Sequence, residues 1–253
     1  MNLSLPSRLA ALAAALLCAA PPLPAQDRPA QALIPVASTP DGIELSIDSA
    51  AVRRTGDSTF FVAAVYRFPD AVARQTGSGR RVEAMEVDCA RGRQRGRYAM
   101  LDGGERLAEP LDGDTAGLFR WAAAGAAELP THRATCEKLL GSFAASLPVT
   151  REIGGVDAPP RLANTPEIRR YMGRFFPPQF RDAAKGGVTL MRVRITESGS
   201  VDPASVSALA STDRAFADAS ADLIRRMHFT PAKVNGQPVS VWITVPVTFG
   251  FEP

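Results

Sequence analysis

Alternating apolar and polar side chains predict a β-sheet in the C-terminal third of the chain. In the runs 189–196 and 239–251 the two kinds of side chain repeat at every second residue, which is the pattern of a strand with one buried face. Gly199 supplies a hairpin turn after the first run, and 201–210 is predicted to form the returning strand. The segment 213–227 repeats its apolar residues at helical spacing, so we expect a helix that covers one face of this sheet.

A second set of strand patterns lies in the first half of the chain. Residues 43–47 alternate apolar and polar side chains, residues 59–66 are a run of β-favouring residues, and the Thr-Gly-Asp turn between them predicts a hairpin. The run 82–89 places Met85 and Val87 on a face that we expect to be buried. The remaining predicted elements are strands at 98–101 and 118–121 and a short helix at 133–140.

These patterns divide the 253 residues into two domains of ordinary size. The segment 26–40 is rich in Pro, Ala and Ser and is typical of a leader or linker. A second linker is predicted at 147–164, where three prolines and two glycines interrupt the strand and helix patterns. We therefore expect an α+β protein with a mostly β domain at 41–146 and a second domain at 165–253, whose first helices lie at 165–174 and 179–184.

Residues 1–25 have the composition of a secretory signal peptide, with one positive charge, an apolar run at 9–20 and then three prolines. Twelve apolar residues at about 1.5 Å each span about 18 Å, which is short of the ~30 Å membrane core. Lipid attachment at Cys18 is the alternative, but Leu17 stands where that modification prefers a small residue. We expect cleavage after Ala25 and a mature chain in the periplasm.

Cys89 and Cys136 remain after that cleavage, in a compartment that oxidises thiols, and we expect them to form a disulfide. A metal or redox site is the alternative. It has little support because the chain has no C-x-x-C motif and only two histidines. The disulfide would attach the helix at 133–140 to the end of the strand at 82–89.

The sequence contains none of the common catalytic motifs: no G-x-S-x-G, H-E-x-x-H, Walker A or G-x-G-x-x-G segment occurs. His132 and His228 are isolated, and Asp112-Gly113-Asp114 lacks the later acids of a calcium loop, so a turn is expected there. The net charge of +3 gives no support to nucleic-acid binding. We therefore expect a protein that is not an enzyme and that uses no cofactor, metal or nucleic acid.

Pro246 lies inside the strand pattern at 239–251. Because proline has no N–H to donate, this strand should lie at the edge of its sheet. An edge strand can accept an extended peptide as an additional strand. Trp242 either contacts such a peptide or covers the sheet against the first domain. The candidate partner-binding residues are Val239, Val241, Trp242, Ile243, Thr244 and Val245.

Four arginines recur at every second position and would line one face of an extended segment. Anionic lipid, lipopolysaccharide phosphate and acidic glycans are candidate ligands for such a face. The alternative is a solvated edge strand whose charges prevent edge-to-edge pairing. The four residues are Arg91, Arg93, Arg95 and Arg97.

An ordered series of motifs occupies residues 157–253: Phe176-Pro177-Pro178, Gly187, Gly199, Phe216, Phe229-Thr230-Pro231-Ala232, Asn235-Gly236-Gln237-Pro238-Val239 and Val245-Pro246-Val247-Thr248-Phe249. This series resembles the TonB C-terminal domain family. The resemblance implies helices on one face of a three-stranded antiparallel sheet, and a last strand that pairs with a short extended segment of outer-membrane transporters. A TonB energy transducer also keeps an N-terminal membrane helix and a long Pro-rich arm. Neither is expected here, so the resemblance supports partner binding but not force transduction.

The first domain, over about residues 40–145, contains Asp48, Val52, Arg54 and Gly56, a strand that ends in Asp88-Cys89, Trp121 and a second cysteine in a late helix. These features are similar to those of the surface-adhesin protein E family. That resemblance indicates no particular mechanism.

Together these features predict a periplasmic TonB-like protein, linked to envelope transport, that binds an extended peptide or a protein partner by strand addition. An outer-membrane receptor is one such partner. The alternative is a structural or adhesion-type envelope protein that binds surface glycan or anionic lipid through its first domain.

Overall fold

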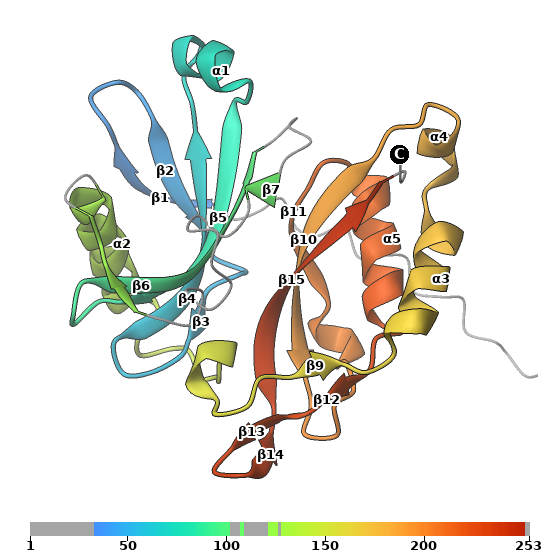
Figure 1. Cartoon of the computed structure of the whole chain (residues 1–253). Coiled ribbons are helices and arrows are strands. Elements are labelled where there is room, and N and C mark those ends of the chain that lie inside the picture. The colour runs from blue at the N-terminus through green and yellow to red at the C-terminus, as the bar shows by residue number, and fades with distance from the viewer. Residues whose placement is uncertain (1–32, 102–106, 109–120, 126–127, 251–253) are drawn as a thin grey trace, which may run out of the picture. The chain divides into compact units, whose positions relative to one another are not determined.

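The computed structural model describes residues 33–101, 107–108, 121–125 and 128–250 (Figure 1). The expected signal peptide, the turn at Asp112 and most of the strand expected at 118–121 lie outside these residues. Within them, no helix is both long and apolar enough to span a membrane.

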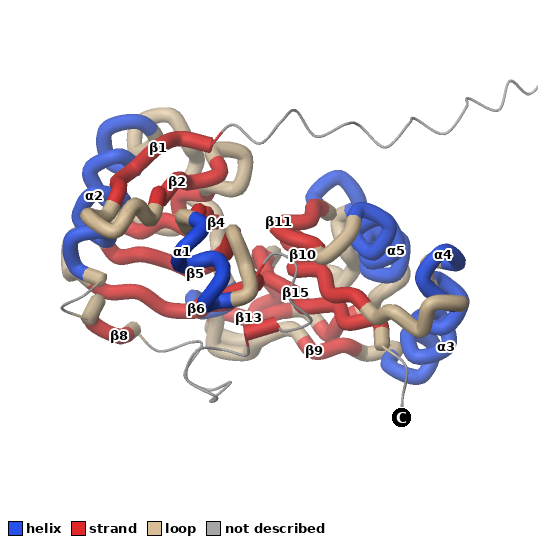
Figure 2. The backbone as a smooth tube through the Cα atoms, turned by 90° about the horizontal axis from the view of Figure 1, so that it is seen from above, coloured by secondary structure: helices blue, strands red, loops and turns tan. Residues whose placement is uncertain are grey.

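The first half of the chain forms an antiparallel sheet with the strand order β1-β2-β4-β5-β6-β7, in which β3 also pairs with β4 and β8 with β6 (Figure 2). β4 and β5 pair along their whole lengths, from Thr59 opposite Asp88 to Arg67 opposite Arg80. The elements are β1 (Leu33–Ser38), β2 (Glu44–Asp48), β3 (Arg53–Arg54), β4 (Thr59–Arg67), α1 (Asp70–Thr76), β5 (Arg80–Asp88), β6 (Arg93–Leu101), β7 (Leu107–Ala108), β8 (Ala122–Ala123) and α2 (Leu129–Ser142).

The central strands of this sheet are buried on both faces. On one face Met85 and Val87 pack with Cys136 and Leu139 of α2, which confirms the buried face predicted for the 82–89 run. On the other face β4 and β5 pack against the C-terminal sheet. That second cluster consists of Ala51, Phe61, Ala63, Val65, Val82, Ala84, Met100, Val188, Leu190 and Leu209.

Four features of this half differ from the sequence prediction. The strand expected at 98–101 begins at Arg93, as β6. Part of the expected leader forms β1, which pairs with β2. Helix α1 was not predicted, because none of its residues is buried and it therefore has no apolar stripe. Helix α2 begins at Leu129 rather than 133, because Pro130 fits the first turn of a helix. The division of the chain into domains and linkers stays a prediction.

The second half forms a three-stranded antiparallel sheet with the order β11-β10-β15, so the protein has the mixed α+β class expected. Helix α5 packs on one face of this sheet and α3 packs against α5 (Figure 1). The elements are β9 (Arg161–Leu162), α3 (Thr165–Phe175), α4 (Pro178–Arg181), β10 (Gly187–Ile195), β11 (Ser207–Ser211), α5 (Arg214–Ile224), β12 (Phe229–Thr230), β13 (Ala232–Val234), β14 (Gln237–Val239) and β15 (Val241–Phe249), with short 3-10 helices at Ile153–Gly155 and Pro203–Ser205.

Aromatic packing holds the helices to this sheet. The ring centroid of Phe176 lies 5.9 Å from that of Phe216 and 6.0 Å from that of Phe249, edge-on in both cases. The Asp213 side chain accepts a hydrogen bond from the Ala215 N–H at 2.8 Å and so caps the start of α5. These contacts place the apolar stripe of α5 on the core side of β10 and β15.

Two strand predictions in this half were wrong in extent. The returning strand begins at Ser207 rather than 201, because Pro203 starts a 3-10 turn that Asp202 caps. The last strand is divided at Ser240. As a result, Val239 lies in β14, which pairs with β13 around the Asn235-Gly236 turn, and β15 begins at Val241.

Candidate functional site

β15 is the edge strand of the C-terminal sheet in the part of the chain that the structure describes. The Trp242 N–H points away from β10 and donates to the Arg151 carbonyl at 2.8 Å. Because β10 and β15 pair without a bulge, every second residue after Trp242 also turns its backbone polar groups outward. Pro246 therefore lies where the sheet needs no N–H, and the edge position predicted from this proline is confirmed.

The chain's own residues 149–155, which we call the strap, occupy the beginning of this edge. Besides the hydrogen bond between Trp242 and Arg151, Glu152 forms a parallel bridge with Trp242. At the start of the strap, the Thr150 N–H donates to the Arg54 carbonyl of β3 at 2.7 Å. The strap thus connects β3 to β15. It lies within the segment that the sequence predicted to be a linker.

The edge is open beyond Trp242. Thr244 and Thr248 direct both N–H and C=O outward, and Pro246 directs its C=O outward. Among the described residues, no strand pairs with this side of β15. Pro246 and Thr248 are exposed and Thr244 is half-buried, so the backbone groups here remain accessible to another chain.

The six residues predicted to bind a partner have different environments. Val241 and Ile243 face the helices and are buried. Trp242 is half-buried, with the guanidinium carbon of Arg53 5.2 Å from its ring centroid, so it covers the sheet against the N-terminal half. Thr244 lies on the open edge, Val245 is half-buried beside it, and Val239 lies in β14. Their role in binding stays a prediction.

A buried ion pair fastens the strap to the sheet. Glu152 of the strap pairs with Arg192 of β10, and their side chains are 4% and 3% exposed. The guanidinium carbon of Arg192 also lies 5.3 Å from the centroid of the Trp242 ring. Burial raises the pKa of Glu152 to about 7, although the positive charge of Arg192 acts in the opposite direction.

A second ion pair lies beside the first. Arg95 of β6 donates to Glu86 at 2.6 Å and to the carbonyl of Gly154 at 2.8 Å. A pocket of about 450 Å³ opens here, and its lining includes Glu86, Arg95, Glu152 and Trp242. Arg95, which bonds both Glu86 and Gly154, and Glu152, which pairs with Arg192, are therefore already engaged in holding the strap.

The predicted arginine series does not form a row of free cations. Arg91 and Arg93 both reach Asp88, at 3.3 and 3.2 Å, and Arg95 pairs with Glu86. Burial raises the pKa of Asp88, but hydrogen bonds from Arg93 and Arg91 outweigh it and hold this pKa below its usual value. The side chain of Arg97 lies outside the described part of the structure. Binding of an anionic ligand by these residues stays a prediction.

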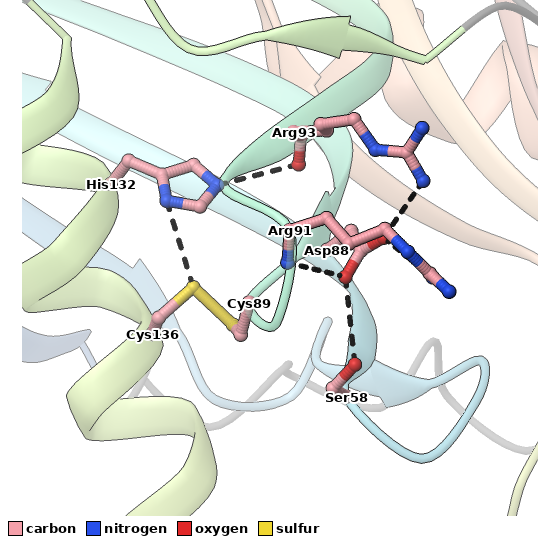
Figure 3. Close-up of a disulfide and its surroundings, with 7 residues drawn as sticks. All are labelled: Ser58, Asp88, Cys89, Arg91, Arg93, His132 and Cys136. Atoms are coloured by element: carbon pink, nitrogen blue, oxygen red, sulfur yellow. Dashed lines mark hydrogen bonds and ion pairs between the residues drawn. A yellow bond between two sulfur atoms is a disulfide. The ribbon is translucent and has the colours of Figure 1, made fainter.

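A disulfide joins Cys89 to Cys136 and so attaches α2 to the end of β5 (Figure 3). His132, one turn before Cys136 on α2, lies with Nε2 3.3 Å from the Arg93 carbonyl oxygen. Figure 3 shows the Asp88–Arg93 pair next to this cross-link. Within the described residues, no three His, Cys, Asp or Glu side chains are grouped to hold a metal ion.

The family comparison agrees with the fold of the second half. Residues 173–251 match the family Gram-negative bacterial TonB protein C-terminal. The match covers α4, α5 and all three strands of the TonB-like sheet. The resemblance of the first half to a surface adhesin is not borne out, and no curated protein matches the chain.

Sequence reasoning missed Glu152, Arg192 and the strap. One signal for Arg192 was available, because it lies between Met191 and Val193 in the middle of a mostly apolar strand, where a buried charge needs a partner. Nothing local distinguished Glu152 from the other charges of the expected linker.

Proposed function

We propose that this protein is a periplasmic TonB-like binding protein that accepts an extended segment of a partner protein as a fourth strand beside β15. The observation that supports this most directly is the open edge from Thr244 to Thr248, at which Pro246 leaves the pairing with β10 intact. The family match supports it independently, because its residues include this whole strand. In the resembled family, such partners are outer-membrane transporters.

The geometry suits a short and reversible interaction. A partner strand gains backbone hydrogen bonds with the outward groups of Thr244, Pro246 and Thr248, and each contributes about 0.5–1.5 kcal/mol net. Main-chain bonds provide affinity without selecting a sequence, so the exposed side chains beside the edge must discriminate between partners. Binding of this kind requires no catalytic group.

Thr248→Pro tests the proposal. The variant removes an outward N–H, as Pro246 already does, so the sheet should fold while the partner loses a donor. The matched control is Thr248→Val, which keeps the N–H. Calorimetric titration with synthetic N-terminal segments of outer-membrane TonB-dependent receptors should show binding by the wild type and by Thr248→Val, and much weaker binding by Thr248→Pro. Equal binding by all three chains would exclude strand addition at this edge.

The adhesion alternative has less support in the described residues. Arg93 and Arg95 are engaged with Asp88 and Glu86, which leaves less uncompensated charge for an anionic lipid or glycan. Arg91 is 68% exposed and is the most accessible of the three, but it also contacts Asp88.

A further inference from the structure

The strap and the open edge together limit the partner that β15 can accept. We propose that the strap is a built-in stop, which occupies the edge at Trp242 and restricts a partner strand to the segment from Thr244 to Phe249. The inference rests on the proposed strand addition, and it specifies the register and length of the added segment. It also assigns the Glu152–Arg192 pair the role of holding the stop in place.

Besides the Glu152–Arg192 ion pair, hydrogen bonds at three residues hold the strap. Thr150 is bonded to Arg54 of β3 through both its N–H, at 2.7 Å, and its hydroxyl, at 3.1 Å. Arg151 accepts the Trp242 N–H, which is the first outward donor of β15. Gly154 accepts a hydrogen bond from Arg95 at 2.8 Å. A partner strand that reached Trp242 would have to replace its hydrogen bond to Arg151, while the contacts of Thr150 and Gly154 still held the strap in place.

Burial makes this replacement unfavourable. Removal of the strap would leave Arg192, which is 3% exposed, without the carboxylate of Glu152. Breaking a buried ion pair by removal of one partner costs more than one new backbone hydrogen bond returns. A partner strand is therefore expected to end beside the strap and not to displace it.

The open segment also specifies which backbone groups the partner must supply. β15 offers two donors, the N–H groups of Thr244 and Thr248, and the carbonyls of Thr244, Pro246 and Thr248 as acceptors. A matching partner segment is short and extended, and it contributes three N–H groups. A proline at any of those three positions of the partner would remove one of the few available bonds.

Hydrogen exchange on the free protein tests the stop without any partner. Amide exchange of the mature chain, followed by NMR, should be slow at Trp242 and fast at Thr248. Glu152→Ala should accelerate exchange at Trp242 by about tenfold or more, which corresponds to about 1.4 kcal/mol. The matched control is Glu167→Ala on the exposed first turn of α3, which should leave Trp242 unchanged. Fast exchange at Trp242 in the wild type would overturn the proposal.

If Glu152→Ala does not fold, as judged by circular dichroism, Glu152→Gln replaces it. This variant keeps an oxygen that can accept from Arg192, so it should accelerate exchange at Trp242 less than the loss of the whole side chain would. An unchanged rate at Trp242 in every folded Glu152 variant would show that this residue does not hold the strap.

Nested peptides then test the effect on binding. Receptor segments of five and nine residues should bind the wild type with equal affinity, because the extra residues find the edge occupied. Glu152→Ala should bind the nine-residue peptide more tightly than the five-residue one. A longer peptide that binds the wild type more tightly and shifts the Trp242 amide signal would contradict the stop. If neither peptide binds, strand addition fails, and the exchange rates alone decide whether the strap covers Trp242.

Discussion

The guanidinium carbon of Arg192 lies 3.6 Å from the ring centroid of Phe61. Arg192 belongs to β10 and Phe61 to β4, so this contact joins the TonB-like sheet to the N-terminal sheet. The same guanidinium pairs with Glu152 of the strap. One buried side chain therefore connects both sheets and the segment that covers the start of β15.

Removal of the positive charge of Arg192 should destabilise the fold. Arg192→Met leaves Glu152 buried without its partner, and at pH 8 we expect the free energy of unfolding to fall by about 3 kcal/mol. The double variant Glu152→Gln with Arg192→Met should lose less, because neither charge remains. Urea denaturation measures both. Arg170→Met, at an exposed position of α3, is the control and should change stability by no more than about 0.5 kcal/mol. A loss for Arg192→Met no greater than that of the control would contradict this role.

Stability should depend on pH through Glu152. Burial raises the pKa of its carboxyl from the usual 4.5 to about 7 in the folded chain, so the folded state holds this proton more tightly. Its contribution to stability is fully present below about pH 4.5 and is lost as the pH rises through 7. Denaturation at pH 5 and pH 8 should show a larger decrease for the wild type than for Glu152→Gln. The same decrease in both proteins would assign the effect to other groups.

The Cys89–Cys136 disulfide should contribute substantially to the stability of the N-terminal half. Its cysteines are separated by 47 residues, and a loop of this length corresponds to about 4 kcal/mol in the chain-entropy description. We expect the double variant Cys89→Ser with Cys136→Ser to lose about 2–4 kcal/mol. Mass mapping of periplasmic protein without reductant should recover one cross-linked peptide pair. Two free thiols in that material would show that the bond does not form.

Two glycines with positive φ offer a matched comparison. Gly199 (φ +82°) and Gly236 (φ +77°) both occupy a backbone region that costs other residues about 1–2 kcal/mol. A Cβ at Gly199 would overlap the backbone oxygen of Phe229, whereas one at Gly236 would meet nothing within 4 Å. Gly199→Ala should therefore lower the melting temperature clearly more than Gly236→Ala. An equal fall in melting temperature for both variants would show that the turn at Gly199 can move away from Phe229.

Much of the TonB-like domain could be predicted from local sequence patterns. The two-residue period locates β10 and β15, the helical period locates α5, and Pro246 places β15 at an edge. These predictions succeed because each depends on neighbouring residues or on the chemistry of one residue. The Cys89–Cys136 pairing was equally accessible, since these are the two cysteines that follow the expected signal peptide and they allow a single bond.

Local sequence patterns were enough to locate the long strands β4, β5, β10 and β15, the main helix, the disulfide partners and the edge position of β15. The occupation of part of this edge by the strap follows from the fold alone. Glu152 and Arg192 are forty residues apart, and no periodicity relates them. Likewise, β1 and the strap look like linker because their residues form ordered structure only by pairing with strands elsewhere in the chain. The energy of such contacts depends on the folded geometry, which brings a buried charge and its partner together.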